Sequence, residues 1–431
     1  MLAETRDSFG ALAAVCLMQV SHAGRRGISS AVPPKLAATV LPGSDRPIPP
    51  RMAVAIVVDW LATPGGAELV IREILAAFPQ ATLFALFDVM TPADRAAITD
   101  RTARTSFMQH IPGIARRYRS LLPIMPFAIR SLDLSEFDVI ISSNHAVAKG
   151  VRVRPGQFHL CYCHSPMRYA WDMRDQYLAD HRISGLKAVA ARTLLRWIRN
   201  WDRASAAGVD RFVVNSHFVG ERVRRNYGRE SVVLHPPVDI DFFTPAGPHD
   251  PDLYVTASRQ VTYKRIDRIV EAFRGLPDRR LVVLGDGPER ARIQAAAAGA
   301  PNISILGEVP RAELRGWLRR ARAFVFAAEE DFGIVPLEAQ ACGTPVIALG
   351  QGGALETVRG EAGIDRTGLF FPDDSAASIA QAVRDFEALT VAPSASACRA
   401  NAERFAAARF REGLLREVRD GWNAERAKAE R

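Results

Sequence analysis

Two glutamates with seven residues between them lie in a segment whose pattern suits an anion. Glu330 falls in a turn that contains Gly333, and Glu338 falls in the helix expected after that turn. The turn follows a strand, offers free backbone N–H groups and faces the positive end of the helix. A carboxylate beside a phosphate is unfavourable unless it accepts hydrogen bonds from hydroxyl groups. The segment therefore suits a ligand with phosphates and sugars, although two ordinary surface acids would give the same pattern.

A second segment places two basic residues where a strand gives way to a helix. Arg259 and Lys264 follow the apolar run Tyr254–Ala257. Basic side chains in a first helical turn oppose the helix dipole, so a bound anion would offset that cost. The forked guanidinium and the ammonium point charge together suit a diphosphate. A solvated basic turn is the alternative.

Two glycine-containing loops also follow expected strands. Gly65 and Gly66 come after Val54–Val58 and would let a loop approach a ligand closely, although a tight turn explains them equally well. Residues 284–289 contain two glycines but lack the full dinucleotide-binding pattern, so alone they are weak evidence.

Alternating apolar strands and amphipathic helices begin at Met52 and predict an α/β fold with two parallel sheets, each covered on both faces. Ligands of such sheets bind at the carboxyl ends of strands, so we expect two facing domains with a site in the cleft between them. The strands expected in the first half are Val54–Val58, Thr82–Phe87, Val139–Ser142, Phe158–Cys163, Phe212–Asn215 and Val232–His235. Those expected in the second half are Tyr254–Ala257, Arg280–Leu284, Ile303–Leu306, Ala323–Phe326 and Pro345–Leu349.

The chain divides into five expected segments. Turn-forming residues with almost no apolar side chain make residues 244–252 a linker. The other segments are a disordered leader or misplaced start over 1–51, Rossmann-like domains over 52–243 and 253–390, and a loop with a C-terminal helix that crosses back over 391–431. The helix is expected from Arg399 to about Lys428.

Composition limits the class of protein. The 431 residues are 48% hydrophobic and 24% charged, which excludes a mostly disordered, fibrous or polytopic membrane protein. The formal net charge of +9 favours anionic partners but is too dilute to identify a nucleic-acid binder. Five cysteines without zinc-finger spacing suit a reduced, cytosolic setting.

These motifs together resemble the fourth family of glycosyltransferases. Glu330 and Glu338 match the two glutamates of that family, and Arg259 and Lys264 match its phosphate-binding pair. The segment 352–357, Gly-Gly-Ala-Leu-Glu-Thr, matches a later loop. The resemblance implies a retaining enzyme with the GT-B fold, two facing Rossmann-like, doubly wound domains.

The resemblance covers residues 52–389, and three runs within it narrow the subgroup. Residues 142–150, 161–172 and 329–344 resemble bacterial O-antigen and exopolysaccharide mannosyltransferases. This similarity implies GDP-mannose as the donor.

The resemblance also implies roles for individual residues. Glu330 would hold hydroxyls of the donor sugar, and Glu338 would bind those of the ribose. Arg259 and Lys264 would neutralise charge on the departing nucleoside diphosphate, a task that a metal ion performs in other transferases, so neither a cofactor nor a metal is expected. His164 would contact the donor sugar near the reacting carbon.

Without the resemblance, His164 would rank no higher than His145 or His235. The resemblance assigns the remaining donor-binding groups to backbone atoms in two loops. These are the N–H groups of Phe332, Gly333, Ile334 and Val335, which would bind the distal phosphate and sugar, and the close-approaching Gly65 and Gly66.

Arginines interleaved with apolar residues suggest contact with a membrane. Residues 101–130 contain six arginines and no acidic residue, and Arg192, Arg196, Arg199 and Arg203 follow helical spacing. Such segments suit an anionic bilayer, although solvated helix faces would look the same. We expect a cytoplasmic protein that docks on the inner membrane, where a polyprenyl-diphosphate-linked saccharide would be the acceptor.

The sequence thus predicts a metal-independent hexosyltransferase, an α-mannosyltransferase that builds surface polysaccharide such as lipopolysaccharide or exopolysaccharide. A sugar-nucleotide epimerase of similar architecture is one alternative. A binding protein for polyanions or nucleic acid is another, but the two glutamates would repel a nucleic-acid backbone, and the aromatic pattern of an RNA-binding sheet is missing.

Overall fold

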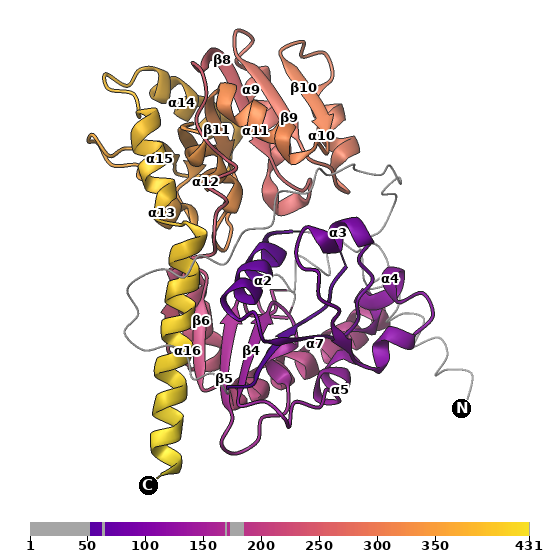
Figure 1. Ribbon diagram of the computed structural model, residues 1–431. Helices are drawn as coiled ribbons and strands as arrows, with labels where there is room; N and C mark the ends of the chain where they lie inside the picture. The colour runs from indigo at the N-terminus through magenta and orange to yellow at the C-terminus, as the bar shows by residue number, and fades with distance from the viewer. Residues whose placement is uncertain (1–51, 63–64, 169, 173–184, 431) are drawn as a thin grey trace. The chain divides into compact units, whose positions relative to one another are not determined.

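The computed structural model describes residues 52–62, 65–168, 170–172 and 185–430 (Figure 1). The leader expected over residues 1–51 lies outside these ranges. The chain forms two compact units. The first unit contains the chain up to Asn215, then Val219–Leu234 and the segment from Arg411 onward, and the second contains Ser216–Phe218 and His235–Phe410.

The first unit is built on a parallel sheet of seven strands in the order β3-β2-β1-β4-β5-β6-β7. The chain moves outward from β1 to β3 on one side and from β4 to β7 on the other, so the winding reverses between β1 and β4. The strands are β1 (Val54–Val58), β2 (Thr82–Ala85), β3 (Arg104–Thr105), β4 (Val139–Asn144), β5 (Phe158–Cys163), β6 (Arg211–Val214) and β7 (Ser231–Val233). With two residues, β3 is too short to leave an apolar pattern in the sequence.

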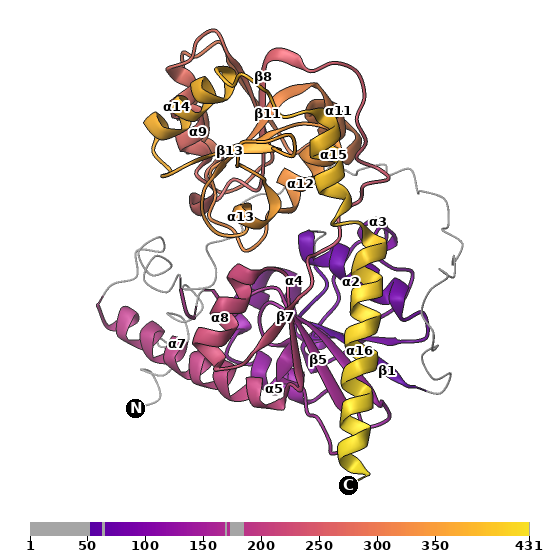
Figure 2. The ribbon, with the colours of Figure 1, turned by 90° about the vertical axis from the view of Figure 1, so that its left-hand side faces the viewer.

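Helices cover both faces of this sheet. On one face, Ile129 of α5 and Ile198 of α7 share a core with Ala55 of β1. On the other face lies the end of the chain, where Gly421 of α16 packs directly against the ring of Phe158. Figure 2 shows α16 running beside these strands. The helices that contribute to this unit are α2 (Gly66–Ala77), α3 (Pro92–Ala96), α4 (Ile114–Arg117), α5 (Met125–Arg130), α7 (Gly185–Ser205), α8 (His217–Tyr227) and α16 (Ala407–Ala429), with 3-10 turns at Phe107–His110, Tyr118–Leu121, Ala148–Gly150 and Ala206–Gly208.

The second unit repeats this plan with six parallel strands in the order β10-β9-β8-β11-β12-β13. Alternate residues of β8 enter separate cores, with Tyr254 beside Phe273 and Val255 beside Leu318, so both faces are buried. The strands are β8 (Asp250–Ala257), β9 (Arg280–Leu284), β10 (Ile303–Gly307), β11 (Ala321–Phe326), β12 (Val346–Leu349) and β13 (Gly368–Phe371). The helices are α9 (Ile266–Arg274), α10 (Arg290–Ala297), α11 (Arg311–Arg320), α12 (Ile334–Ala341), α13 (Ala354–Thr357), α14 (Ala376–Glu387) and α15 (Ala395–Glu403), with a 3-10 turn at Thr262–Lys264. The α/β fold with two Rossmann-like domains is confirmed.

Two boundaries differ from those expected. The main segment of the second unit begins at His235, before the linker placed over 244–252; Phe243 is buried in the core of this unit, and β8 already begins at Asp250. The continuous helix expected from Arg399 is broken between α15 and α16. The carbonyl of Phe405 accepts a hydrogen bond from Val238 N–H at 2.8 Å there, which ties the break to the start of the second unit.

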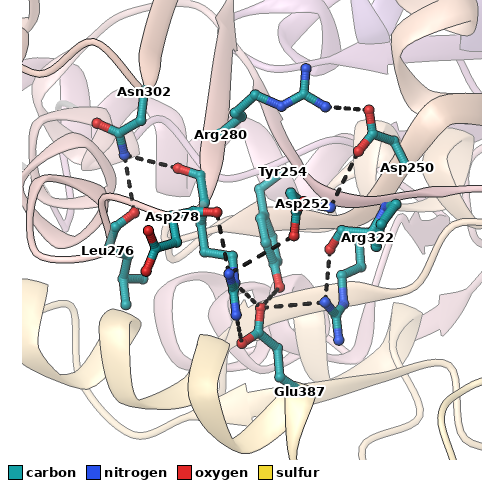
Figure 3. A network of polar contacts seen from close by, with 11 residues as sticks. Asp250, Asp252, Tyr254, Leu276, Asp278, Arg280, Asn302, Arg322 and Glu387 are labelled. Atoms are coloured by element: carbon teal, nitrogen blue, oxygen red, sulfur yellow. Dashed lines mark hydrogen bonds and ion pairs between the residues drawn. The ribbon is translucent and has the colours of Figure 1, made fainter.

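A network of charged groups lies near the amino ends of strands in the second unit (Figure 3). Glu387, the last residue of α14, accepts hydrogen bonds from Tyr254 Oη and Arg279 Nε at 2.6 Å each, and from Arg279 Nη2 at 3.0 Å. Arg322 of β11 adds an ion pair at 3.5 Å. The network therefore fastens α14 to β8, to the start of β9 and to β11.

We predict that Glu387→Gln lowers the free energy of unfolding of the second unit by about 1–3 kcal/mol, because two guanidinium groups lose their charged acceptor. Burial acts to raise the pKa of Glu387, but hydrogen bonds from Arg279 and Tyr254 outweigh it and hold the pKa below its ordinary value of 4.5. The carboxylate therefore stabilises the fold fully above pH 4.5, and this stabilisation is lost as the pH falls through the lowered pKa. Urea denaturation of wild type and variant between pH 3 and 7 measures this difference; exposed Glu361→Gln is the control, and equal midpoints at pH 7 would contradict the prediction.

Candidate functional site

The predicted cation and the predicted acid meet in the second unit. Lys264 ends the 3-10 turn after β8, and Glu330 lies in the loop after β11. Because β8 and β11 are neighbouring parallel strands, their carboxyl ends lie at one edge of the sheet. The ammonium group of Lys264 forms an ion pair with the Glu330 carboxylate, and the two side chains are 12% and 18% exposed. An acid and a base 66 positions apart thus form one charged pair.

The glycine-containing loop after β9 packs against the loop that carries Arg259 and Lys264. From the sequence alone, this glycine-containing loop was weak evidence for a site. Gln260 N–H donates to Asp286 O at 2.9 Å, and its side-chain amide donates to Gly285 O at 2.8 Å. Gly285 has φ 105°, and a Cβ there would overlap the carbonyl group of Ser258. The two loops are therefore packed backbone against backbone. Arg259, between Ser258 and Gln260, is exposed, and the described part of the chain provides no ion-pair partner for it.

A pair of glycines shapes the other side of the Glu330 loop. Gly353 N–H donates to Glu330 O at 2.8 Å. A Cβ on Gly353 would overlap the backbone of Phe332 and lie 2.7 Å from Asp331 O, and Gly352 has φ 64°. The later loop that matched the family thus fixes the backbone of residues 330–332.

The second glutamate has a different environment. Glu338 is the fifth residue of α12 and only 7% exposed. Burial raises its pKa to about 7, although Arg311 opposes this rise and Asp239 adds to it. Glu330 pairs with Lys264, whereas Glu338 interacts electrostatically with Arg311 and Asp239. That both carboxylates face one ligand stays a prediction.

The turn before α12 is anchored by an aromatic side chain. Phe332 is buried with Leu337 and Phe405, and its ring stacks on His235 at 5.3 Å between centroids. Gly333 then takes φ 89°, a left-handed conformation that glycine adopts without strain, and α12 begins at Ile334. The first N–H groups of an α-helix have no partner within the helix. The N–H groups of Ile334 and Val335 thus lie in the first turn of α12, directly after the Glu330 loop, as the sequence predicted.

The remaining predicted residues belong to the first unit. His164 follows β5, and its Nε2 lies 2.8 Å from Ser143 Oγ. Burial and the nearby His145 lower the pKa of His164 to about 3. The imidazole is therefore neutral near pH 7 and can exchange hydrogen bonds but cannot serve as a charged acid. Gly65 and Gly66 are exposed at the start of α2, and Gly65 is extended with φ −165°, so its backbone does not require glycine.

Sequence reasoning missed Asp59, the residue directly after β1. Its carboxylate is buried and accepts hydrogen bonds from backbone N–H groups that lie 86 to 89 positions further along the chain. An acidic residue at the carboxyl end of the first strand was the available signal, but no local pattern indicates partners that distant.

The two units define the class of the protein. Each is a parallel, doubly wound α/β unit, and the second carries an ion pair and a helix N-terminus at the carboxyl ends of its strands. This is the fold of GT-B glycosyltransferases. Solved structures with this fold include Anabaena HepE in complex with UDP (17% identity, TM-score 0.63, covering 86% of this chain and 100% of that one). Sucrose-phosphate synthase from Thermosynechococcus elongatus is similar too (19% identity, TM-score 0.64, covering 87% and 100%).

Family comparisons agree with the fold. Residues 64–242 match the family described as Glycosyltransferase Family 4, and residues 238–405 match Glycosyl transferases group 1. The two matches together cover most of the chain, which therefore belongs to the glycosyltransferases that combine these two domains.

Curated relatives match over part of their length. A D-inositol 3-phosphate glycosyltransferase of Catenulispora acidiphila is 30% identical over 190 residues, which are 37% of this chain and 45% of the relative. A GDP-mannose-dependent phosphatidylinositol monomannoside mannosyltransferase of Mycolicibacterium smegmatis is 33% identical over 208 residues, 41% and 52% of the two chains. The chain thus spans about half the length of the curated relatives it matches.

Two glycines of the second unit differ in the space around them, and substitution by alanine tests this difference. We predict that Gly353→Ala lowers stability by more than 1 kcal/mol, because the added Cβ must displace the backbone of residues 331–332. Gly316→Ala in α11, where a Cβ meets no atom within 4 Å, should instead raise stability by about 0.5–1 kcal/mol. Chemical denaturation measures both changes, and similar stabilities for the two variants would contradict the packing described here.

Proposed function

We propose that the protein is a retaining glycosyltransferase that transfers a hexose, mannose from GDP-mannose, to a lipid-linked saccharide in the synthesis of surface polysaccharide. The observation that carries the proposal is the ion pair of Lys264 with Glu330 in the loop that leads into α12. The GDP-mannose dependence in the printed names of two relatives supports the choice of donor.

In the proposed donor complex, the diphosphate takes the place of Glu330 as the partner of Lys264. Glu330 then accepts hydrogen bonds from sugar hydroxyls, and the N–H groups that begin α12 hold the distal phosphate. Arg259, exposed in the same loop as Lys264, adds a second positive charge. Both cations counter the negative charge that grows on the departing nucleoside diphosphate, so no metal ion is needed in this proposal.

Glu338 is proposed to bind the ribose hydroxyls. A carboxylate accepts two hydroxyl hydrogen bonds, whereas a protonated carboxyl group accepts fewer. With its pKa raised to about 7, Glu338 is only partly ionised in the free protein near neutral pH. Hydroxyl donors stabilise the charged form of Glu338, so ribose binding would lower its pKa and release a proton.

Retention of configuration has two possible routes. The leaving phosphate can accept the proton of the attacking hydroxyl on the face from which it departs, or a covalent intermediate can form and be displaced. Neutral His164 remains the residue proposed to hydrogen-bond the sugar near the reacting carbon.

An exposed aromatic pair in the first unit supports the proposed docking on an anionic inner-membrane surface. Phe127 is 63% exposed, and its ring stacks on that of Trp197, itself exposed, at 6.2 Å between centroids. Arg130 on the helix of Phe127 and Arg196 beside Trp197 are exposed as well. Among the described helices, none is long and apolar enough to cross a bilayer. Surface docking would bring a polyprenyl-diphosphate-linked acceptor within reach.

The deciding experiment is a panel of GDP- and UDP-sugars tested for thermal stabilisation. A ligand at a hundred times its dissociation constant adds about 2.7 kcal/mol, and we expect GDP-mannose to give the largest effect. The same result in EDTA is expected if no metal takes part. Stabilisation by no nucleotide sugar would contradict the proposal.

We predict that Arg259→Ala and Lys264→Ala each reduce turnover at saturating donor on the order of a hundredfold, by analogy with deletion of one transition-state donor. Release of nucleoside diphosphate measures turnover. Arg384→Ala, an exposed cation on α14, is the matched control and should retain wild-type turnover. Near-normal turnover in both site variants would refute their assignment.

For the membrane, we predict that the protein sediments with phosphatidylglycerol vesicles at low salt and is released as salt rises, because screening weakens arginine–lipid attraction. The double variant Phe127→Ser with Trp197→Ser should bind several-fold more weakly. Ile364→Ser, which removes an apolar side chain that is 90% exposed in the second unit, is the control. A wild-type protein that stays in the supernatant at low salt would rule out docking.

A further inference from the structure

Asp59, directly after β1, binds the loop that follows the neighbouring strand β4. Its Oδ2 accepts hydrogen bonds from His145 N–H at 2.7 Å and Ala146 N–H at 2.9 Å, and its Oδ1 accepts from Val147 at 2.5 Å and Ala148 at 2.7 Å. An ionised carboxylate has about four lone-pair sites, so these four N–H groups satisfy it. The loop after β4 is thereby fixed to the end of β1.

The same carboxylate orients an imidazole. His145 Nδ1 lies 3.0 Å from Asp59 Oδ2, so the carboxylate lies beside one nitrogen of the ring. The ring packs edge-on against Trp60 at 4.6 Å between centroids. Its side chain is 37% exposed, and Nε2 has no hydrogen-bond partner among the residues that the structure describes. Four backbone hydrogen bonds to Asp59 already hold the loop, so the loop does not need the exposed imidazole of His145 for its own stability.

The location is one at which ligands of such sheets bind. Asp59 and His145 directly follow β1 and β4, the strands between which the winding reverses. The ring of His164 lies 6.4 Å from that of His145, and Asn144 O accepts the N–H of His164 at 2.9 Å. Glu68, in the first turn of α2, interacts electrostatically with His145. Two imidazoles, the carboxyl group of Glu68 and the ring of Trp60 thus lie together at this end of the first unit.

This grouping favours a ligand with many hydroxyl groups. Imidazoles form single hydrogen bonds with hydroxyls, and carboxylates accept from hydroxyls. The net negative charge of Asp59 and Glu68 opposes a phosphate at this position. An aromatic wall with a few convergent polar groups is the usual form of a small-molecule site.

We propose that His145, positioned by Asp59, binds a hydroxyl of the acceptor saccharide in the first unit through a hydrogen bond at Nε2. Asp59 is the positioning residue, because it fixes the loop that carries His145 and lies beside Nδ1 of the ring. The inference deepens the proposed function by naming an acceptor-binding residue.

The test uses the full chain with ¹⁵N-labelled histidine and three soluble probes, the methyl glycosides of mannose, glucose and galactose. At least one glycoside should shift the Nε2 signal of His145 in the wild-type spectrum. His145→Ala should bind that glycoside roughly tenfold more weakly, the cost of about one hydrogen bond to a polarised acceptor. His145→Gln should restore part of the binding, since its side-chain amide can also form a hydrogen bond with a hydroxyl.

Asp59→Asn tests the positioning role. It should change the proton distribution on the His145 ring and weaken glycoside binding, a spectroscopic effect that loss of stability alone does not produce. His110→Ala, an exposed histidine elsewhere in the first unit, is the control and should leave every signal of His145 unchanged. The His145 variants keep the test valid if Asp59→Asn fails to fold.

Two results would overturn the inference: no glycoside shifts the His145 signals, or His145→Ala binds as wild type does. Stabilisation by nucleotide sugars, measured on the same samples, separates this failure from failure of the proposed function. Nucleotide-sugar binding without glycoside binding removes the His145 site alone. Glycoside binding at His145 without nucleotide-sugar binding supports the site and removes the transferase proposal.

Discussion

Parallel pairing of strands decides where this protein can carry out chemistry. Every strand pair in both sheets is parallel, so the carboxyl ends of the strands meet at one edge, and the loops that leave them become neighbours. Lys264 and Glu330 depend on this in the second unit, as do Asp59 and His145 in the first. The chain between the members of each pair forms the helices that bury the sheet. The hydrogen bonds between strands that build each sheet therefore also bring the charged groups together.

The pattern of apolar residues was sufficient to predict the strands that are buried on both faces. The limits of Phe158–Cys163 and Arg280–Leu284 were predicted to the residue, because each is an apolar run next to a turn or a charge. The edge strands β3 and β13 were missed, whereas the edge strands β7 and β10 were predicted as Val232–His235 and Ile303–Leu306. With two residues, β3 is too short to leave an apolar pattern. The break between α15 and α16 was missed as well. It contains neither proline nor glycine, and the bond from the distant Val238 N–H to Phe405 O at this point has no local signal in the sequence.

The candidate site was predictable to the extent that its groups are local. The turn before α12 could be read from the sequence because glycine, acid and helix start follow one another. The partner of each charge could not, since Glu330 pairs with Lys264 while Glu338 interacts with Arg311 and Asp239. The role of Asp59 was the least accessible, because all of its backbone partners lie beyond residue 144. Residue type and spacing thus located the loops, whereas the pairing of the charged side chains became clear only from the structure.

The return of α16 to the first unit has a consequence for how the protein is made. This helix covers Phe158 and is joined to α2 by the ion pair of Arg411 with Glu73. A ribosome releases β5 and α2 long before it synthesises residue 411, so the nascent first unit must wait with an apolar face uncovered while the second unit is translated. Multidomain chains in this state are prone to aggregate. The unit that is synthesised first is therefore completed last.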